Sequence, residues 1–125
     1  MIIIEEIQGD TLTPIAIFER LHGKKKFLLE SSLKHENSGR YSFIGANPTM
    51  ELIGTTKDSK IITNKGEEII HSPPLETLKK IIPTANGTDT LLPFIGGAVG
   101  YVGYDVIRYY EEIGMEPYDE LHIPD

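Results

Sequence analysis

Four polar side chains in this sequence have types and a spacing that suit the binding of a small zwitterion: Glu30, Ser31, Arg40 and Ser42. An ammonium group needs hydrogen-bond acceptors and a carboxylate needs donors, and this set offers a carboxylate, a guanidinium and two hydroxyls. Spacing alone leaves a simpler interpretation open. Glu30 and Arg40 would then form a salt bridge that holds the intervening loop, because ion pairs are common and ligand sites are few.

Two strands and a loop are needed to bring these side chains together. We expect a buried strand over residues 26–32, because an apolar run stops abruptly there at a carboxylate and two hydroxyls. A second strand is expected over residues 40–45, which lie between glycines and alternate in character. The polar residues 33–38 between them are expected to form a solvent-facing loop. The candidate side chains would then lie at neighbouring strand ends, beside apolar walls.

The first two thirds of the chain mix strand and helix signals. Residues 2–7 are mostly β-branched and predict a first strand. A helix should follow, capped by Thr11 or Thr13, with Pro14 in its first turn and Gly23 at its end. Three further strands, over residues 49–54, 60–63 and 67–71, predict a meander with an exposed edge, whose second and third strands are joined by a tight turn at residues 64–66.

The last third begins with a helix signal. Ser72-Pro73-Pro74 should start this helix, and its apolar stripe consists of Leu75, Leu78, Ile81 and Ile82. A polar loop over 84–90 and a glycine-rich strand or pair of strands over 91–104 should follow, and Asp105 should cap a last helix. Together these elements predict an α+β fold in one domain, residues 1–125, with mostly antiparallel strands and two or three flanking helices.

Other patterns that could carry chemistry are weak. The glycines at 96, 97, 100 and 103 lack the order of a nucleotide-binding loop, so they are expected to allow close packing. The four histidines have no metal-ligand spacing, and no serine lies in a nucleophile elbow. The acidic pairs at 111–112 and 119–120 are expected to be a solvated face. No catalytic residue and no metal ligand is therefore predicted in this chain.

The composition narrows the class of protein. The chain has 125 residues and a net charge of −7, which argues against binding to nucleic acid or to anionic membranes. It contains no cysteine, so disulfides and thiol chemistry are excluded. It has neither a signal peptide nor an apolar run near the roughly 20 residues that a membrane-spanning helix needs. A soluble, cytoplasmic protein is expected.

Two motifs resemble the N-terminal region of anthranilate synthase component I, a member of the chorismate-utilising enzymes. The first motif is Leu28-Leu29-Glu30-Ser31 followed by Gly39-Arg40-Tyr41-Ser42-Phe43-Ile44-Gly45-Ala46-Asn47-Pro48. The second is the segment from Pro93 to Asp105, with its four glycines. The motifs have the order and rough spacing that the family shows, and the resemblance covers essentially the whole chain.

The resemblance implies a function that the residues alone do not give. Members of this family convert chorismate to anthranilate and pyruvate, using Mg²⁺ and ammonia from a glutamine amidotransferase partner subunit. L-tryptophan inhibits them, and the matching positions of the inhibitor site here are Leu29, Glu30, Ser31, Arg40, Tyr41 and Ser42. The chorismate and magnesium residues of the family lie further toward the C-terminus, beyond this chain. The chain is therefore expected to be an inactive fragment that binds tryptophan weakly or not at all.

The resemblance also implies that these strands belong to a larger β-sandwich, so an unpaired edge here would invite self-association.

Three alternatives remain open. The large subunit of aminodeoxychorismate synthase, in folate biosynthesis, is the nearest, although its motif tends toward Leu-Asp-Ser. The second is a stand-alone amino-acid-binding module, which would need a closed pocket within this chain. The third is a structural domain that docks a partner, for which an exposed apolar patch would be the sign.

Overall fold

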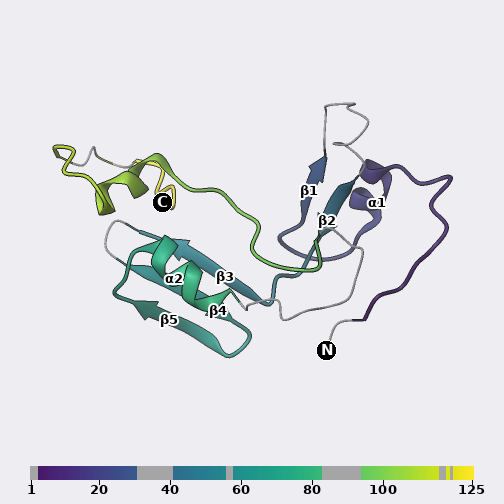
Figure 1. Cartoon of the computed structure of the whole chain (residues 1–125), viewed down its shortest axis with the longest axis horizontal. Coiled ribbons are helices and arrows are strands. Elements are labelled where there is room, and N and C mark those ends of the chain that lie inside the picture. The colour runs from purple at the N-terminus through teal and green to yellow at the C-terminus, as the bar shows by residue number, and fades with distance from the viewer. Residues whose placement is uncertain (1–2, 31–40, 56–57, 83–93, 116–117, 119) are drawn as a thin grey trace. The chain divides into compact units, whose positions relative to one another are not determined.

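The computed structural model describes residues 3–30, 41–55, 58–82, 94–115, 118 and 120–125. The chain divides into two compact units, residues 1–48 and residues 49–125. Helices and short antiparallel strands occur in both (Figure 1), which confirms the predicted α+β class.

The first unit contains helix α1 (Pro14–Arg20) and strands β1 (Phe27–Glu30) and β2 (Ser42–Gly45). Thr13 caps α1, since its hydroxyl accepts a hydrogen bond from the Ala16 amide at 3.3 Å, and the proline follows in the first turn as predicted. The helix ends at Arg20, before the predicted Gly23, because Leu21 already has an extended backbone. α1 contacts both strands, which pair with each other as a two-stranded antiparallel sheet.

The second unit is built on the meander of β3 (Met50–Gly54), β4 (Ser59–Thr63) and β5 (Gly66–Ile70), in the order β3-β4-β5. Helix α2 (Pro74–Ile81) lies against one face of this sheet (Figure 1). The predicted meander and its turn are confirmed. The turn before Gly66, which has a φ of 135°, suits the glycine that the sequence provides.

The packing of α2 differs from the predicted stripe. Its buried residues are Pro74 and Thr77, whereas Leu75 and Ile82 are exposed. The proline ring sits where Gly54 has no side chain: a Cβ added there would lie 2.6 Å from Pro74 Cγ. The close approach of the first helical turn to β3 therefore sets which residues of α2 are covered.

Two predicted strands are wrong where the structure describes them. Residues 3–7 pair with no strand, and their isoleucines are exposed. Residues 94–103 also form no strand, and both Gly96 and Gly97 have a φ of 151°, outside the β region. A strand needs a hydrogen-bonded neighbour as well as β-branched residues, and the described chain supplies none for either segment.

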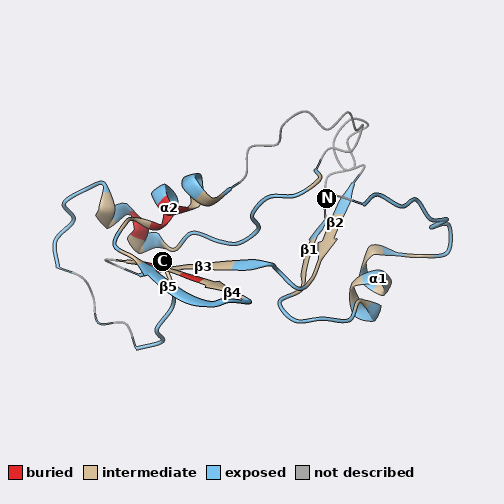
Figure 2. Ribbon diagram, turned by 90° about the horizontal axis from the view of Figure 1, so that it is seen from below, coloured by how far each residue is buried: buried red, intermediate tan, exposed pale blue. Residues whose placement is uncertain are grey.

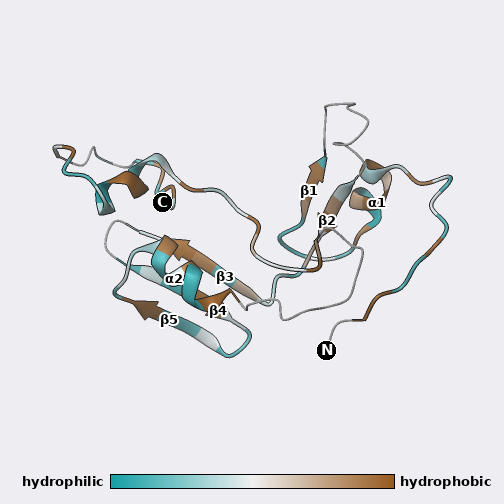
Figure 3. Cartoon of the chain, viewed as in Figure 1, coloured by the Kyte–Doolittle hydropathy of each residue, from teal (hydrophilic) through white to brown (hydrophobic). Residues whose placement is uncertain are grey.

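The last predicted helix is a short 3-10 helix, η1 (Tyr104–Tyr109), preceded by Gly103, which takes the capping position assigned to Asp105. The Asp105 carboxylate instead accepts a hydrogen bond from Arg108 Nε at 2.6 Å. Among the described residues, the buried hydrophobic side chains besides the Pro74 ring are Ile61, 6% exposed, and Val106, 5% exposed. Apolar residues lie mostly at half-buried or exposed positions, as comparison of Figures 2 and 3 shows.

Candidate functional site

The register of β1 and β2 places two of the predicted site residues directly opposite each other. Glu30 pairs with Ser42 at the end of the two-stranded sheet, and both are exposed. Directly opposed residues in an antiparallel pair have Cβ atoms roughly 4.5–5.5 Å apart. The prediction that Glu30 and Ser42 meet at neighbouring strand ends is therefore confirmed.

The same register divides the predicted site between two faces of the sheet. Side chains alternate along a strand, so one face carries Glu30 and Ser42, and we call it the Glu30 face. The opposite face carries Leu29 and its partner Phe43, and we call it the Phe43 face. Tyr41 belongs with the Phe43 face because its ring stacks on Phe43, with centroids 6.4 Å apart and an interplanar angle of 25°.

The open part of the Phe43 face lies at the same strand end as Glu30. At the other end the Phe27 ring covers Gly45, where an added Cβ would collide with the ring. Leu29 and Tyr41 are each 48% exposed. The arrangement offers a carboxylate and a hydroxyl on one side of the strand end, and an aliphatic and aromatic surface on the other. Phe43 is not among the six predicted site residues, although it alternates with Ser42 in the sequence.

Two of the six predicted residues, Ser31 and Arg40, lie outside the described residues. The proposed Glu30–Arg40 salt bridge and the role of the Ser31 hydroxyl both stay predictions.

The far end of the two-stranded sheet is anchored by side chains that hold its strands in register. Asn47 Oδ1 accepts a hydrogen bond from the Lys24 amide at 2.9 Å, and the Asn47 amide donates to the Lys24 carbonyl at the same distance. Lys26 Nζ donates to the Phe18 carbonyl at 2.9 Å and lies 4.6 Å from the centre of the Phe18 ring. These contacts tie together α1, the start of β1 and the end of β2, and they thereby help to position Glu30 and Ser42.

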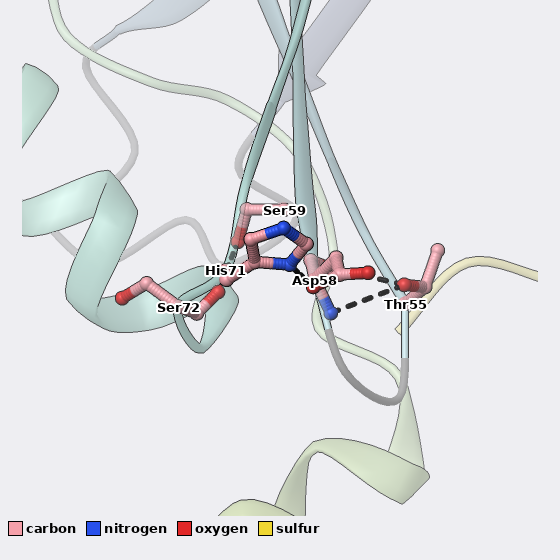
Figure 4. Close-up of polar contacts among 5 residues, drawn as sticks. All are labelled: Thr55, Asp58, Ser59, His71 and Ser72. Carbon is pink, nitrogen blue, oxygen red and sulfur yellow. Dashed lines mark hydrogen bonds and ion pairs between the residues drawn. The ribbon is translucent and has the colours of Figure 1, made fainter.

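A second polar cluster, in the other unit, joins the turn after β3 to the start of α2 (Figure 4). His71 Nδ1 lies 2.5 Å from Asp58 Oδ1, and Asp58 is also bonded to Thr55. Ser59 is completely buried, and its hydroxyl donates to the Ser72 carbonyl at 2.7 Å. The serine hydroxyl bonds away from the histidine, so the cluster has no activated nucleophile and acts as a structural brace.

Within the described ranges, no three histidine, aspartate or glutamate side chains come together as a metal site would require. In the same part of the chain, no helix combines the length and the apolar character needed to cross a membrane.

The comparison with curated proteins identifies the class of relative, and three proteins named anthranilate synthase component 1 illustrate it. The Lactococcus lactis protein is 37% identical over 98% of this chain and 26% of its own length. The Acetivibrio thermocellus and Aquifex aeolicus proteins are 38% and 40% identical, each over 96% of this chain and 25% of their own length.

These matches confirm the predicted resemblance: along nearly its whole length, the chain is related to one part of anthranilate synthase component 1. The chain spans about a quarter of the length of the curated relatives it matches. No family model matches it, and no solved structure gives a significant match.

Proposed function

We propose that the chain is the N-terminal, feedback-regulatory part of an anthranilate synthase component 1, an enzyme of tryptophan biosynthesis. The whole protein would convert chorismate and ammonia, released from glutamine, to anthranilate and pyruvate. The observation that carries the proposal is the similarity to proteins of that name over nearly all of this chain. The opposed Glu30 and Ser42 are consistent with it, because they give the matched motif a polar strand end.

The regulatory ligand in this proposal is L-tryptophan. The Glu30 carboxylate would accept hydrogen bonds from the ammonium group, and hydroxyl and guanidinium donors at Ser31, Arg40 and Ser42 would hold the carboxylate. Leu29 and Tyr41 lie on the opposite face, so the indole would have to reach around the strand end to gain apolar surface from them. Tryptophan can inhibit only if it binds one arrangement of the whole protein better than another, so the remaining part of the enzyme must complete the site.

Catalysis would depend on the part of the protein outside this chain. Mg²⁺ would bind there and would supply the positive charge that offsets the negative charge of the substrate. A glutamine amidotransferase partner, component 2, would supply the ammonia. The whole enzyme would work in the cytoplasm, and this chain alone would have no turnover.

A chimera tests the proposal. This chain replaces the matched quarter of the Lactococcus lactis protein, and anthranilate formation from chorismate and ammonium is followed with increasing tryptophan. We expect turnover that tryptophan inhibits. Glu30→Gln and Ser42→Ala should each raise the tryptophan concentration for half inhibition by about tenfold or more, since the first removes the negative charge that faces the ammonium group and the second removes a hydrogen bond to the carboxylate. Glu19→Gln, an exposed change on α1, is the matched control and should leave inhibition unchanged.

Two outcomes count against the proposal. An active chimera that tryptophan does not inhibit would contradict the proposed regulatory role of this chain. Inhibition that persists unchanged in both Glu30→Gln and Ser42→Ala would show that tryptophan binds at other residues.

A further inference from the structure

The outer edge of β5 is paired with no other strand in the described residues. β5 is the last strand of its sheet and pairs only with β4. Residues 66–69 are exposed, and Ile69 is 63% exposed. An edge of this kind offers its outer backbone N–H and C=O groups to a further strand.

Two carboxylates control what can pair there. Glu67 and Glu68 are neighbours in the strand, so they point to opposite faces of the sheet. Glu67 forms an ion pair with Lys60 Nζ at 2.5 Å, on the face that also carries Ile62. Glu68 lies opposite Ile61 on the face covered by α2. A strand added to this edge would meet one negative charge on each face.

This pattern disfavours pairing between two copies of β5. Consider two antiparallel β5 strands in which a residue of one copy lies opposite the same residue of the other. If that residue is Glu67 or Glu68, carboxylates of the two copies lie directly opposite each other, and directly opposed like charges are destabilising. A register centred on Ile69 would need His71 in the ladder. His71 is held by Asp58, and the Ser72 amide donates to the Ile70 carbonyl, so the chain turns away at that point.

We propose that the β5 edge binds an extended segment of a partner protein that carries two consecutive lysine or arginine residues next to two apolar residues. In antiparallel addition the basic pair lies opposite Glu67 and Glu68, and an apolar residue lies opposite Ile69. Backbone hydrogen bonds hold the segment, and the charges select it against acidic segments and against a second copy of β5. This surface is independent of the site at Glu30 and Ser42.

The test is an NMR titration of this chain with three synthetic probe peptides. The first is acetyl-Thr-Val-Val-Lys-Lys-Thr-amide, which has the proposed order. The second replaces both lysines with glutamate. The third has the composition of the first but separates its two lysines. We expect saturable shifts of the amides of residues 66–70 with the first peptide, and binding about tenfold weaker with each of the others, from two cross-strand charge pairs.

Charge reversal gives the matched variants. Glu68→Lys leaves the Lys60–Glu67 ion pair in place and should weaken the lysine peptide while strengthening the glutamate peptide. The double change Glu111→Lys with Glu112→Lys alters more charge at exposed positions outside the strands, and it should leave the preference unchanged. A native spectrum for each variant shows that the fold is retained.

Three results would overturn the proposal: no shifts in β5 with the lysine peptide, equal binding of the peptide with separated lysines, or shifts spread over all acidic surfaces. The last result would mean general attraction to a chain of net charge −7.

Discussion

At the scale of single residues, two hydroxyls occupy the most buried positions around the meander. Ser59 is 0% exposed and Thr77 is 2% exposed, but their situations differ. The Ser59 hydroxyl donates to a carbonyl, whereas Thr77 Oγ1 is buried and has no hydrogen-bond partner among the described residues. A buried polar atom that lacks a partner lowers stability, and replacing it by an apolar group of the same shape removes that penalty.

Thr77→Val should therefore stabilise the second unit by about 1 kcal/mol, because valine keeps the shape and removes the unpaired hydroxyl. Ser59→Ala should destabilise it by about 1–2 kcal/mol, because the Ser72 carbonyl loses its donor. Urea unfolding followed by the NMR signals of β4 measures both. Equal changes in the same direction would show that Thr77 Oγ1 is satisfied in solution.

The surroundings of Gly54 leave no room for a side chain. A Cβ there would meet the Pro74 ring at 2.6 Å and the Asp125 carbonyl oxygen at 3.1 Å. We expect Gly54→Ala to destabilise the second unit by about 1–3 kcal/mol, since the helix start must move away from the sheet. Gly100→Ala is the matched control, because nothing lies within 4 Å of its added Cβ. A Gly54→Ala variant as stable as the control would show that Pro74 is not packed on β3.

At the scale of elements, local signals predicted what local interactions determine. The Thr13 cap, the turn before Gly66, the meander and the pairing of β1 with β2 all follow from capping, turn chemistry and alternation. The wrongly predicted strands fell on residues 3–7 and 94–103, where strand formation depends on a partner that local sequence does not specify. For the site, Glu30 and Ser42 met as predicted, but the division between two faces needed the exact register, in which Leu29 pairs with Phe43.

The N-terminal cap of α1 gives a prediction confined to one element. Thr13→Ala should lower the helix content of residues 14–20 at a cost of about 0.5–1 kcal/mol, and Thr13→Ser should preserve it. No residue of α1 is fully buried, so packing compensates little for a lost cap. Carbonyl and Cα chemical shifts of α1 report the change. Unchanged shifts in Thr13→Ala would mean that contacts with β1 and β2 hold the helix without its cap.

At the scale of the whole molecule, the small number of buried apolar side chains limits stability. In the described part of the chain, Ile61, Val106 and the Pro74 ring are buried, while isoleucines, tyrosines and leucines are exposed in both units. Burial of apolar surface contributes about 25 cal/mol per Å², and a domain with little of it is only marginally stable. If the chain is part of a longer protein, as proposed above, it should gain much of its stability from the remainder of that protein.

The isolated chain should therefore unfold at low urea concentration, over a broad transition, and should bind a hydrophobic dye. The same residues within the Lactococcus lactis chimera should resist hydrogen exchange more strongly, most clearly in residues 94–103. Equal exchange rates in the isolated chain and in the chimera would contradict this. Light scattering at several concentrations reports whether the exposed surfaces also cause self-association.

The stacked pair of Tyr41 and Phe43 gives the candidate site an optical readout. The chain contains six tyrosines and no tryptophan, so bound tryptophan would be the only indole in the sample attached to protein. Tyr41 lies at the strand end that carries Glu30 and Ser42, close enough to pass its excitation energy to an indole held there. The part of the indole emission that comes by energy transfer from Tyr41 would then report ligand binding without a label, and Tyr41→Phe would remove that part while keeping the ring.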